Sequence, residues 1–79
     1  MIRIPQRLQN TLREVMDKLQ PALLTHLTLA GELSLDAQQR FDMQQALGDE
    51  LCESGLKPDD EPNERGYAIE ELIDLVGKA

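Results

Sequence analysis

The regular spacing of apolar residues near the N-terminus constrains the fold of this chain more than any other feature. Between residues 5 and 19 the apolar side chains recur at intervals of three and four, at Leu8, Leu12, Val15, Met16 and Leu19. This spacing places them on one side of an α-helix. Pro5 suits the first turn, where its missing N–H has no helical partner. The sequence therefore predicts a helix over residues 5–19, which ends before Pro21 because the proline ring disfavours the helical conformation of Gln20.

A longer helix is predicted over residues 35–54, where the apolar residues again follow helical spacing. Met43, Leu47 and Leu51 form one stripe along it. A second stripe beside the first consists of Ala37, Phe41, Gly48 and Cys52. Two adjacent stripes predict either a broad buried side at the centre of a helical bundle or a second side that contacts a partner. Gly55 is expected to cap the C-terminus of this helix.

The last helix is predicted over residues 67–76, after a loop rich in proline, glycine and aspartate. Its inward side consists of Ile69, Leu72, Ile73 and Val76. Glu70, Glu71 and Asp74 lie on the outward side, and Gly77 ends the helix. The helix therefore adds an acidic surface to the predicted bundle.

The segment between the first two helices has two interpretations. In one, a helix over residues 21–30 begins at Pro21 and ends at Gly31. The hydroxyl of Ser34 then caps the following helix, and Asp36 lies near the positive end of its dipole. This interpretation predicts a four-helix chain without strands.

In the other interpretation, residues 25–35 form a hairpin. A two-residue turn would pair Leu29 with Glu32, whereas a three-residue turn would pair Leu29 with Leu33 and Leu27 with Leu35. Helices are favoured, because leucine fits strands less well than β-branched or aromatic residues do. We therefore predict a single all-α domain over residues 1–79, a small three- to four-helix bundle, with an α+β fold containing this hairpin as the alternative.

Composition and charge limit the function. The chain has 79 residues, one cysteine and a net charge of −7, so it is one small domain without an intramolecular disulfide. Residues 1–20 carry a balance of +2 and residues 21–79 a balance of −9. Nucleic-acid binding is not expected, because it needs a basic surface. The sequence also has no signal-peptide pattern and no membrane-spanning stretch, which predicts a cytoplasmic protein without a membrane partner.

A short motif around Ser34 resembles the acyl carrier proteins. In that family a serine at a helix start, within a Gly-x-Asp-Ser-Leu motif, carries a phosphopantetheine arm, and Gly31, Ser34, Leu35 and Asp36 match part of this motif. Leu33 replaces the aspartate before the serine. The resemblance implies an acyl- or peptidyl-carrier protein modified on Ser34 with 4'-phosphopantetheine; the alternative for Ser34 is an ordinary helix cap.

The acidic loop also contains a candidate cation site. Asp59, Glu61, Asn63 and Glu70 occupy oxygen-ligand positions of a twelve-residue calcium loop. However, Glu64 stands at the sixth position, where that loop needs glycine for its turn. We therefore expect a solvated acidic loop and no metal site.

No catalytic group is recognisable in the sequence. Cys52 and His26 are each the single residue of their type, they lie in different predicted elements, and no third group is evident to orient them. We expect no enzyme activity and no cofactor.

The expected function is that of a small acidic protein-interaction module, such as an adaptor, inhibitor or regulatory subunit. The expected partner is a protein, with a basic surface favoured by charge complementarity; a homo-oligomer formed through the second stripe of residues 35–54 is an alternative. The residues expected to contact a partner are Glu61, Glu64, Glu70, Glu71, Asp74 and Phe41.

Overall fold

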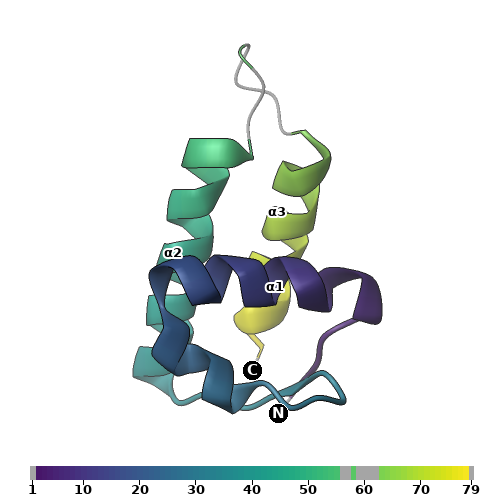
Figure 1. Ribbon diagram of the computed structural model, residues 1–79. Coiled ribbons are helices and arrows are strands. Elements are labelled where there is room, and N and C mark those ends of the chain that lie inside the picture. Colours follow the sequence, from purple (N-terminus) through teal and green to yellow (C-terminus); the bar gives the residue numbers. More distant parts are fainter. Residues whose placement is uncertain (1, 56–57, 59–62, 79) are drawn as a thin grey trace.

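The structure, a computed structural model, describes residues 2–55, 58 and 63–78. Its elements follow in the order β1 (Ile2–Arg3), α1 (Gln6–Leu19), the 3-10 helix η1 (Pro21–His26), β2 (Glu32–Leu33), α2 (Ala37–Ser54) and α3 (Glu64–Val76). Figure 1 shows their arrangement. The predicted small helical bundle is confirmed, and a short two-stranded sheet accompanies it.

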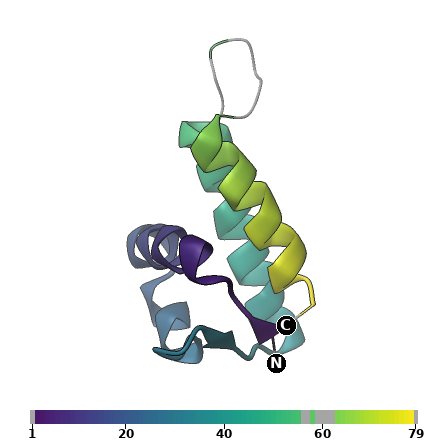
Figure 2. The same ribbon diagram turned by 90° about the vertical axis from the view of Figure 1, so that its right-hand side faces the viewer.

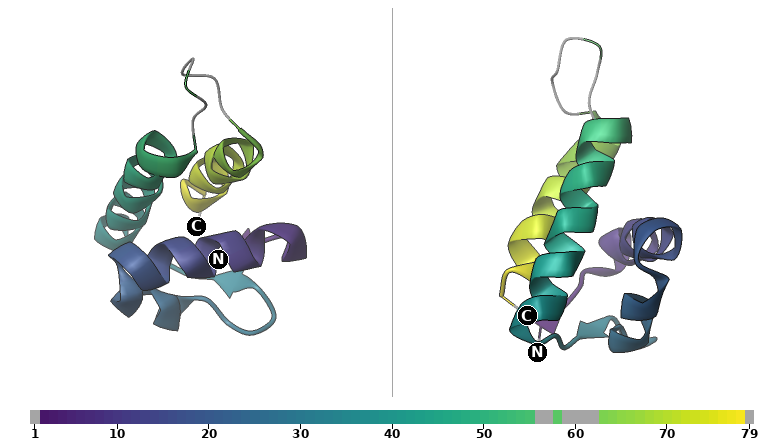
Figure 3. Two further views of the ribbon diagram at one scale, coloured as in Figure 1. Left: turned by 45° about the horizontal axis from the view of Figure 1, so that its top comes forward. Right: turned by 90° about the vertical axis from the view of Figure 1, so that its left-hand side faces the viewer.

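The helices form two layers. α2 and α3 lie side by side and run in opposite directions, and α1 crosses in front of both (Figure 1). η1 and the turn that follows it lie on the same side of this pair as α1 (Figures 2 and 3). The α2–α3 pair therefore has an inner side, which α1 covers, and an opposite side, which no other described helix covers.

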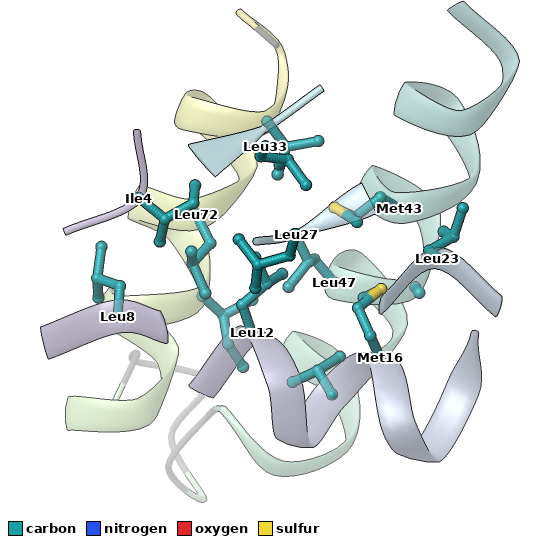
Figure 4. Close-up of a cluster of buried hydrophobic side chains, with 14 residues drawn as sticks. Ile4, Leu8, Leu12, Met16, Leu23, Leu27, Leu33, Met43, Leu47 and Leu72 are labelled. Atoms are coloured by element: carbon teal, nitrogen blue, oxygen red, sulfur yellow. The ribbon is translucent and has the colours of Figure 1, made fainter. Parts of the chain in front are cut away.

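The core fills the space between the two layers. Figure 4 shows side chains from α1, from η1 and the hairpin, and from α2 and α3 pointing toward one another. The buried apolar residues are Ile4, Leu8, Leu12, Val15, Met16, Leu23, Leu27, Leu33, Met43, Ala46, Leu47, Ile69, Leu72 and Val76. The apolar positions predicted for α1 and for the first stripe of α2 supply much of this core.

The segment before α2 combines parts of both predicted alternatives. It begins as η1, which ends at His26, instead of forming the expected helix over residues 21–30. A hairpin follows, in which Leu27 bridges to Leu33 and the Thr28 N–H donates to the Glu32 carbonyl at 2.9 Å. Neither predicted register is correct. Pairing Leu27 with Leu33 buries both leucines, and Leu29 is left exposed in the turn.

The hairpin is extended by a strand that the sequence analysis did not predict. β1 pairs with β2 in the antiparallel sense, with Ile2 opposite Leu33. Gly31 makes this arrangement possible, because its φ of 88° lies in the left-handed region and its carbonyl accepts from the Ile4 N–H at 2.7 Å. The N-terminus is thereby joined to the turn before α2.

The start of α2 differs from the prediction. Asp36, and not Ser34, is the N-cap: its side chain accepts from the Gln39 N–H at 2.7 Å, and Gln39 Oε1 accepts from the Asp36 N–H at 3.0 Å. This reciprocal pair is a capping box, which satisfies two backbone donors at once. Ser34 has no residue three positions later that could close such a box, since that residue is Ala37.

The other helix ends lie close to their predicted positions. Gly55 and Gly77 are the C-caps of α2 and α3, as expected. α3 starts at Glu64, earlier than the predicted 67, because the Asn63 side chain caps it by accepting from the Gly66 N–H at 2.8 Å. None of the helices in the described part of the chain is long and apolar enough to cross a bilayer.

Candidate functional site

The side of α2 and α3 that faces away from α1 is the candidate functional site. Two of the three large apolar side chains that the described residues leave exposed lie on these helices, Phe41 at 58% and Tyr67 at 63%. We call this surface the outer face. It consists of Phe41, Gly48, Asp49 and Cys52 on α2 and of Tyr67, Glu70 and Asp74 on α3.

On α2, the outer face corresponds to the second apolar stripe of the sequence. Residues at intervals of four and seven share one side of a helix, which aligns Phe41, Gly48 and Cys52. The opposite side of α2 buries Met43 and Leu47 in the core. The expectation that both stripes form one broad buried side is therefore wrong, because Phe41 and Cys52 are exposed. Their position fits the other expectation, a second side available to a partner.

On α3, Tyr67, Glu70 and Asp74 are exposed and follow each other at intervals of three and four, so they share one side of the helix. Two close approaches show which parts of the two helices lie side by side. Gln44 Nε2 donates to the Ile73 carbonyl at 3.1 Å, and the backbones of Gly55 and Gly66 are so close that a Cβ built on Gly55 would lie 3.0 Å from the Gly66 Cα. The portion between these contacts contains Gly48 and Cys52 on α2 and Tyr67 and Glu70 on α3.

The carboxylates of the outer face lie on both sides of its apolar stripe. Asp49 is exposed and lies next to Gly48, three residues before Cys52, whereas Glu70 and Asp74 lie on the neighbouring helix. The ion pairs among the described residues leave Asp49, Glu70 and Asp74 unmatched. The outer face is thus an apolar line with carboxylates along both edges that have no ion-pair partner in the described part of the chain.

The structure separates the residues that were predicted to contact a partner. Phe41, Glu70 and Asp74 lie on the outer face. Glu71 instead forms an ion pair with Arg7 of α1, so it joins the two layers. Glu64 is exposed in the first turn of α3. Glu61 lies outside the described residues.

Sequence reasoning missed a charged cluster on the inner side of the pair. Its centre is Glu50 of α2, whose side chain is 4% exposed. Lys18 of α1 contacts Glu50 Oε1 at 2.9 Å, and Arg65 of α3 contacts Glu50 Oε2 at 3.3 Å. Ser54 Oγ also donates to Glu50 Oε2, at 2.9 Å. Glu50 therefore links all three α-helices.

These contacts determine the protonation of the cluster. The hydrogen bond from Lys18 lowers the pKa of Glu50 below its usual 4.5, with further lowering by Ser54 and Arg65, although burial opposes the effect. The same bond raises the pKa of Lys18 above 10.5. Arg65 also pairs with Glu14 at 3.1 Å, which raises its own pKa. These ion pairs and the Ser54 hydrogen bond join the three α-helices through Glu50.

Ser34 lies outside the helix that it was expected to cap. It is exposed, between β2 and the N-cap Asp36, and its backbone N–H donates to the His26 carbonyl at 3.3 Å. The carrier-protein resemblance places its serine at a helix start, whereas here the N-cap lies two residues further on, at Asp36, and α2 starts at Ala37. The resemblance therefore does not extend to the geometry of the helix start.

Cys52 and His26 do not form a catalytic pair. His26 Nε2 lies 3.0 Å from Gln39 Nε2, in the first turn of α2. Cys52 lies in the last turn of α2 and is exposed. At 1.5 Å per residue, the thirteen-residue separation of Gln39 and Cys52 corresponds to about 20 Å along the helix.

The structure describes two of the four candidate ligands of the calcium-loop interpretation. Asn63 uses its side chain to cap α3 and to donate to the Ser54 carbonyl, and Glu70 lies within α3. Asp59 and Glu61 lie outside the described residues. Within the described ranges, no group of three or more His, Cys, Asp or Glu side chains is arranged to hold a metal ion.

A shallow hollow of about 330 Å³ lies between α1 and η1, lined by Arg13, Glu14, Asp17 and Leu24. Two of its polar side chains make contacts within the chain. Arg13 donates to the Thr28 carbonyl at 3.1 Å, and Glu14 pairs with Arg65.

Comparison of the chain with protein-family models, curated proteins and solved structures gives no match. The geometry of the outer face is thus the main guide to function.

Proposed function

We propose that this chain is a non-catalytic protein-interaction module that binds a basic protein partner through the outer face. The observation that carries the proposal is the exposure of Phe41 and Tyr67 beside three carboxylates that have no ion-pair partner among the described residues. Aromatic side chains are typical anchors of protein interfaces, because they bury a large apolar area when a partner covers them.

The distribution of charge supports a basic partner. Arg7, Lys18 and Arg65 are engaged in ion pairs that join the helices. The carboxylates of the outer face would attract a cationic surface and orient it during the encounter. The same negative charge would repel nucleic acid. An adaptor, inhibitor or regulatory subunit would work through such a contact without chemistry of its own.

The proposal is tested by photo-crosslinking in the cells that make the protein. A benzophenone-bearing phenylalanine analogue replaces Phe41 in one variant and Leu29 in a control variant. Leu29 is 95% exposed but lies in the hairpin, which is not part of the outer face. We expect position 41 to crosslink to one protein, with a yield that falls when the lysate is brought to high salt before irradiation. A yield at position 41 no greater than at position 29 would contradict the proposal.

The same samples test the two alternatives. An intact mass raised by about 340 Da on Ser34, the mass of a phosphopantetheine arm, would indicate a carrier protein instead. A crosslinked product with twice the 8.9 kDa mass of the chain would indicate a homo-oligomer. Phe41→Asp should dissociate such an oligomer, because it would place a charge in the interface.

A further inference from the structure

Gly48 is unexplained by the structure of the chain itself. It lies well inside α2, where glycine is the least favourable residue after proline. Gly31 is the glycine with a positive φ among the described residues, so backbone conformation does not require glycine at position 48. Packing among the described residues does not require it either, because a Cβ at Gly48 would meet none of their heavy atoms within 4 Å.

Two other glycines show what an internal requirement looks like. A Cβ at Gly31, where φ is 88°, would lie 3.0 Å from the Ile4 carbonyl oxygen, and one at Gly55 would lie 2.9 Å from the Leu51 carbonyl oxygen. Backbone atoms of the chain crowd both positions. Gly48 faces open space instead, in line with Phe41 and Cys52.

A glycine on a helix surface has a direct use when a second helix packs against it. The distance between two packed helix axes depends on the side chains at the crossing point, and glycine allows the shortest approach. From Phe41 to Cys52 the apolar line of α2 extends about 16 Å, at 1.5 Å per residue. A helix of about three turns would cover that length.

The charge of the outer face distinguishes between the helices that could lie there. A second copy of this chain would bring its own Asp49, Glu70 and Asp74 against the same carboxylates, and each chain carries a net charge of −7. Like charges placed together in an interface disfavour the complex. A helix with an apolar stripe bordered by lysine or arginine would instead match the apolar line and both of its acidic edges.

We infer that the partner binds the outer face with a basic amphipathic α-helix that crosses α2 at Gly48. This inference rests on the proposed function and adds the secondary structure of the partner segment, its chemistry and its point of closest approach. Gly48 is a contact residue in this arrangement, Phe41 and Tyr67 are the apolar anchors, and Glu70 and Asp74 pair with the cations of the partner.

The test uses the partner segment that crosslinks to position 41. Mass spectrometry identifies the crosslinked peptide, and a synthetic peptide of that sequence is titrated against the full chain. We expect the peptide to carry basic and apolar residues at helical spacing and to gain helical circular dichroism on binding. The amide signal of Gly48 should shift during the titration, and the peptide should slow alkylation of Cys52.

Gly48→Leu is the decisive variant. The added side chain fills open space in the free protein but overlaps the partner helix, so affinity should fall about tenfold or more. Asn10→Leu is the matched control, since it adds the same side chain to an exposed position on α1 and should leave affinity unchanged. The unfolding midpoint of Gly48→Leu should equal or exceed that of the unmodified chain, which separates lost binding from lost folding.

Charge reversal tests the chemistry of the partner. Asp74→Lys combined with Glu70→Lys should weaken binding and reduce its dependence on salt, whereas Asp17→Lys, an exposed position on α1, should have a smaller effect.

The outcomes separate this inference from the proposed function. If position 41 crosslinks to no protein, both are wrong. If it crosslinks to a different protein, but the bound segment is not helical or Gly48→Leu binds as well as the unmodified chain, the interaction function stands and the inference is wrong. A crosslinked segment from a second copy of this chain would overturn both the basic partner and the inference.

Discussion

The two sides of the α2–α3 pair differ in whether their apolar side chains are buried and in whether their carboxylates form ion pairs among the described residues. On the inner side, Leu47 and Leu72 are fully buried against the α1 layer, and Glu50 is paired with cations from two other helices. On the outer face, Phe41 is exposed and Glu70 has no ion-pair partner among the described residues. Apolar and acidic side chains therefore stabilise the fold on the inner side, whereas on the outer face they remain available for contacts.

The comparison is tested most strongly by removing an apolar side chain from each side. Leu47→Ala should lower the free energy of unfolding by about 2–5 kcal/mol, because it removes buried apolar surface and leaves a cavity. Phe41→Ala should change it by about 0.5 kcal/mol or less, since the ring is largely exposed. Urea unfolding followed by circular dichroism measures both values. Equal losses would mean that Phe41 is part of the core and that the two sides do not differ.

The second test compares a carboxylate from each side. Glu50→Gln keeps the shape of the side chain but removes the charge that Lys18 and Arg65 contact, and should lower the free energy of unfolding by about 1–3 kcal/mol. Values near the lower limit are expected, because Lys18 and Arg65 are 49% and 33% exposed and can be solvated. Glu70→Gln, measured in the same way, should have an effect of about 0.5 kcal/mol or less. A larger effect of Glu70→Gln would show that the outer face stabilises the fold.

Lowering the pH should reduce the stability that Glu50 contributes to the folded state. The pKa of Glu50 is lowered in the folded state, so the folded state binds this proton less readily than the unfolded state does. The stability that Glu50 contributes is then complete above its ordinary pKa of 4.5 and is lost as the pH falls through the lower, folded value. The unmodified chain should lose more stability between pH 7 and acidic pH than Glu50→Gln does.

Urea unfolding at a series of pH values measures this difference. Glu70→Gln serves as the control and should keep the pH dependence of the unmodified chain. If Glu50→Gln keeps that dependence as well, Glu50 does not hold its proton more weakly in the folded state, and the cluster would need a different description.

The contrast between the two sides also explains what the sequence could predict. Helical spacing in α1 identifies both the helix and its buried side, because Leu8, Leu12 and Met16 form a single apolar stripe and all three are buried. The same reasoning finds two apolar stripes on α2 but cannot tell which one faces the core. That choice depends on where α1 crosses, which spacing within a single helix does not encode.

Glu50 was missed for a related reason. A glutamate in a helix usually lies in solvent, and its partners Lys18 and Arg65 are distant in the sequence and come from other helices. The start of α2, in contrast, could have been predicted from the sequence, because Asp36 followed three residues later by Gln39 is the pattern of a capping box. β1 could not be predicted, since a two-residue strand has no periodicity and forms only when β2 lies beside it.

The smallest predicted effect is that of replacing Gly48 on the outer face. The informative result is whether the replacement raises or lowers the free energy of unfolding. Gly48→Ala should raise the free energy of unfolding by about 0.5–1 kcal/mol, because alanine favours the helix and its Cβ meets nothing within 4 Å. Gly31→Ala is the contrasting variant and should destabilise the fold, since φ is 88° there and Gln9 Nε2 lies 2.2 Å from the new Cβ. Thermal and urea unfolding measure both. A protein made more stable by Gly48→Ala keeps a glycine that its own fold does not need, whereas a loss of stability would mean that α2 requires the glycine internally and that no partner need be invoked to explain it.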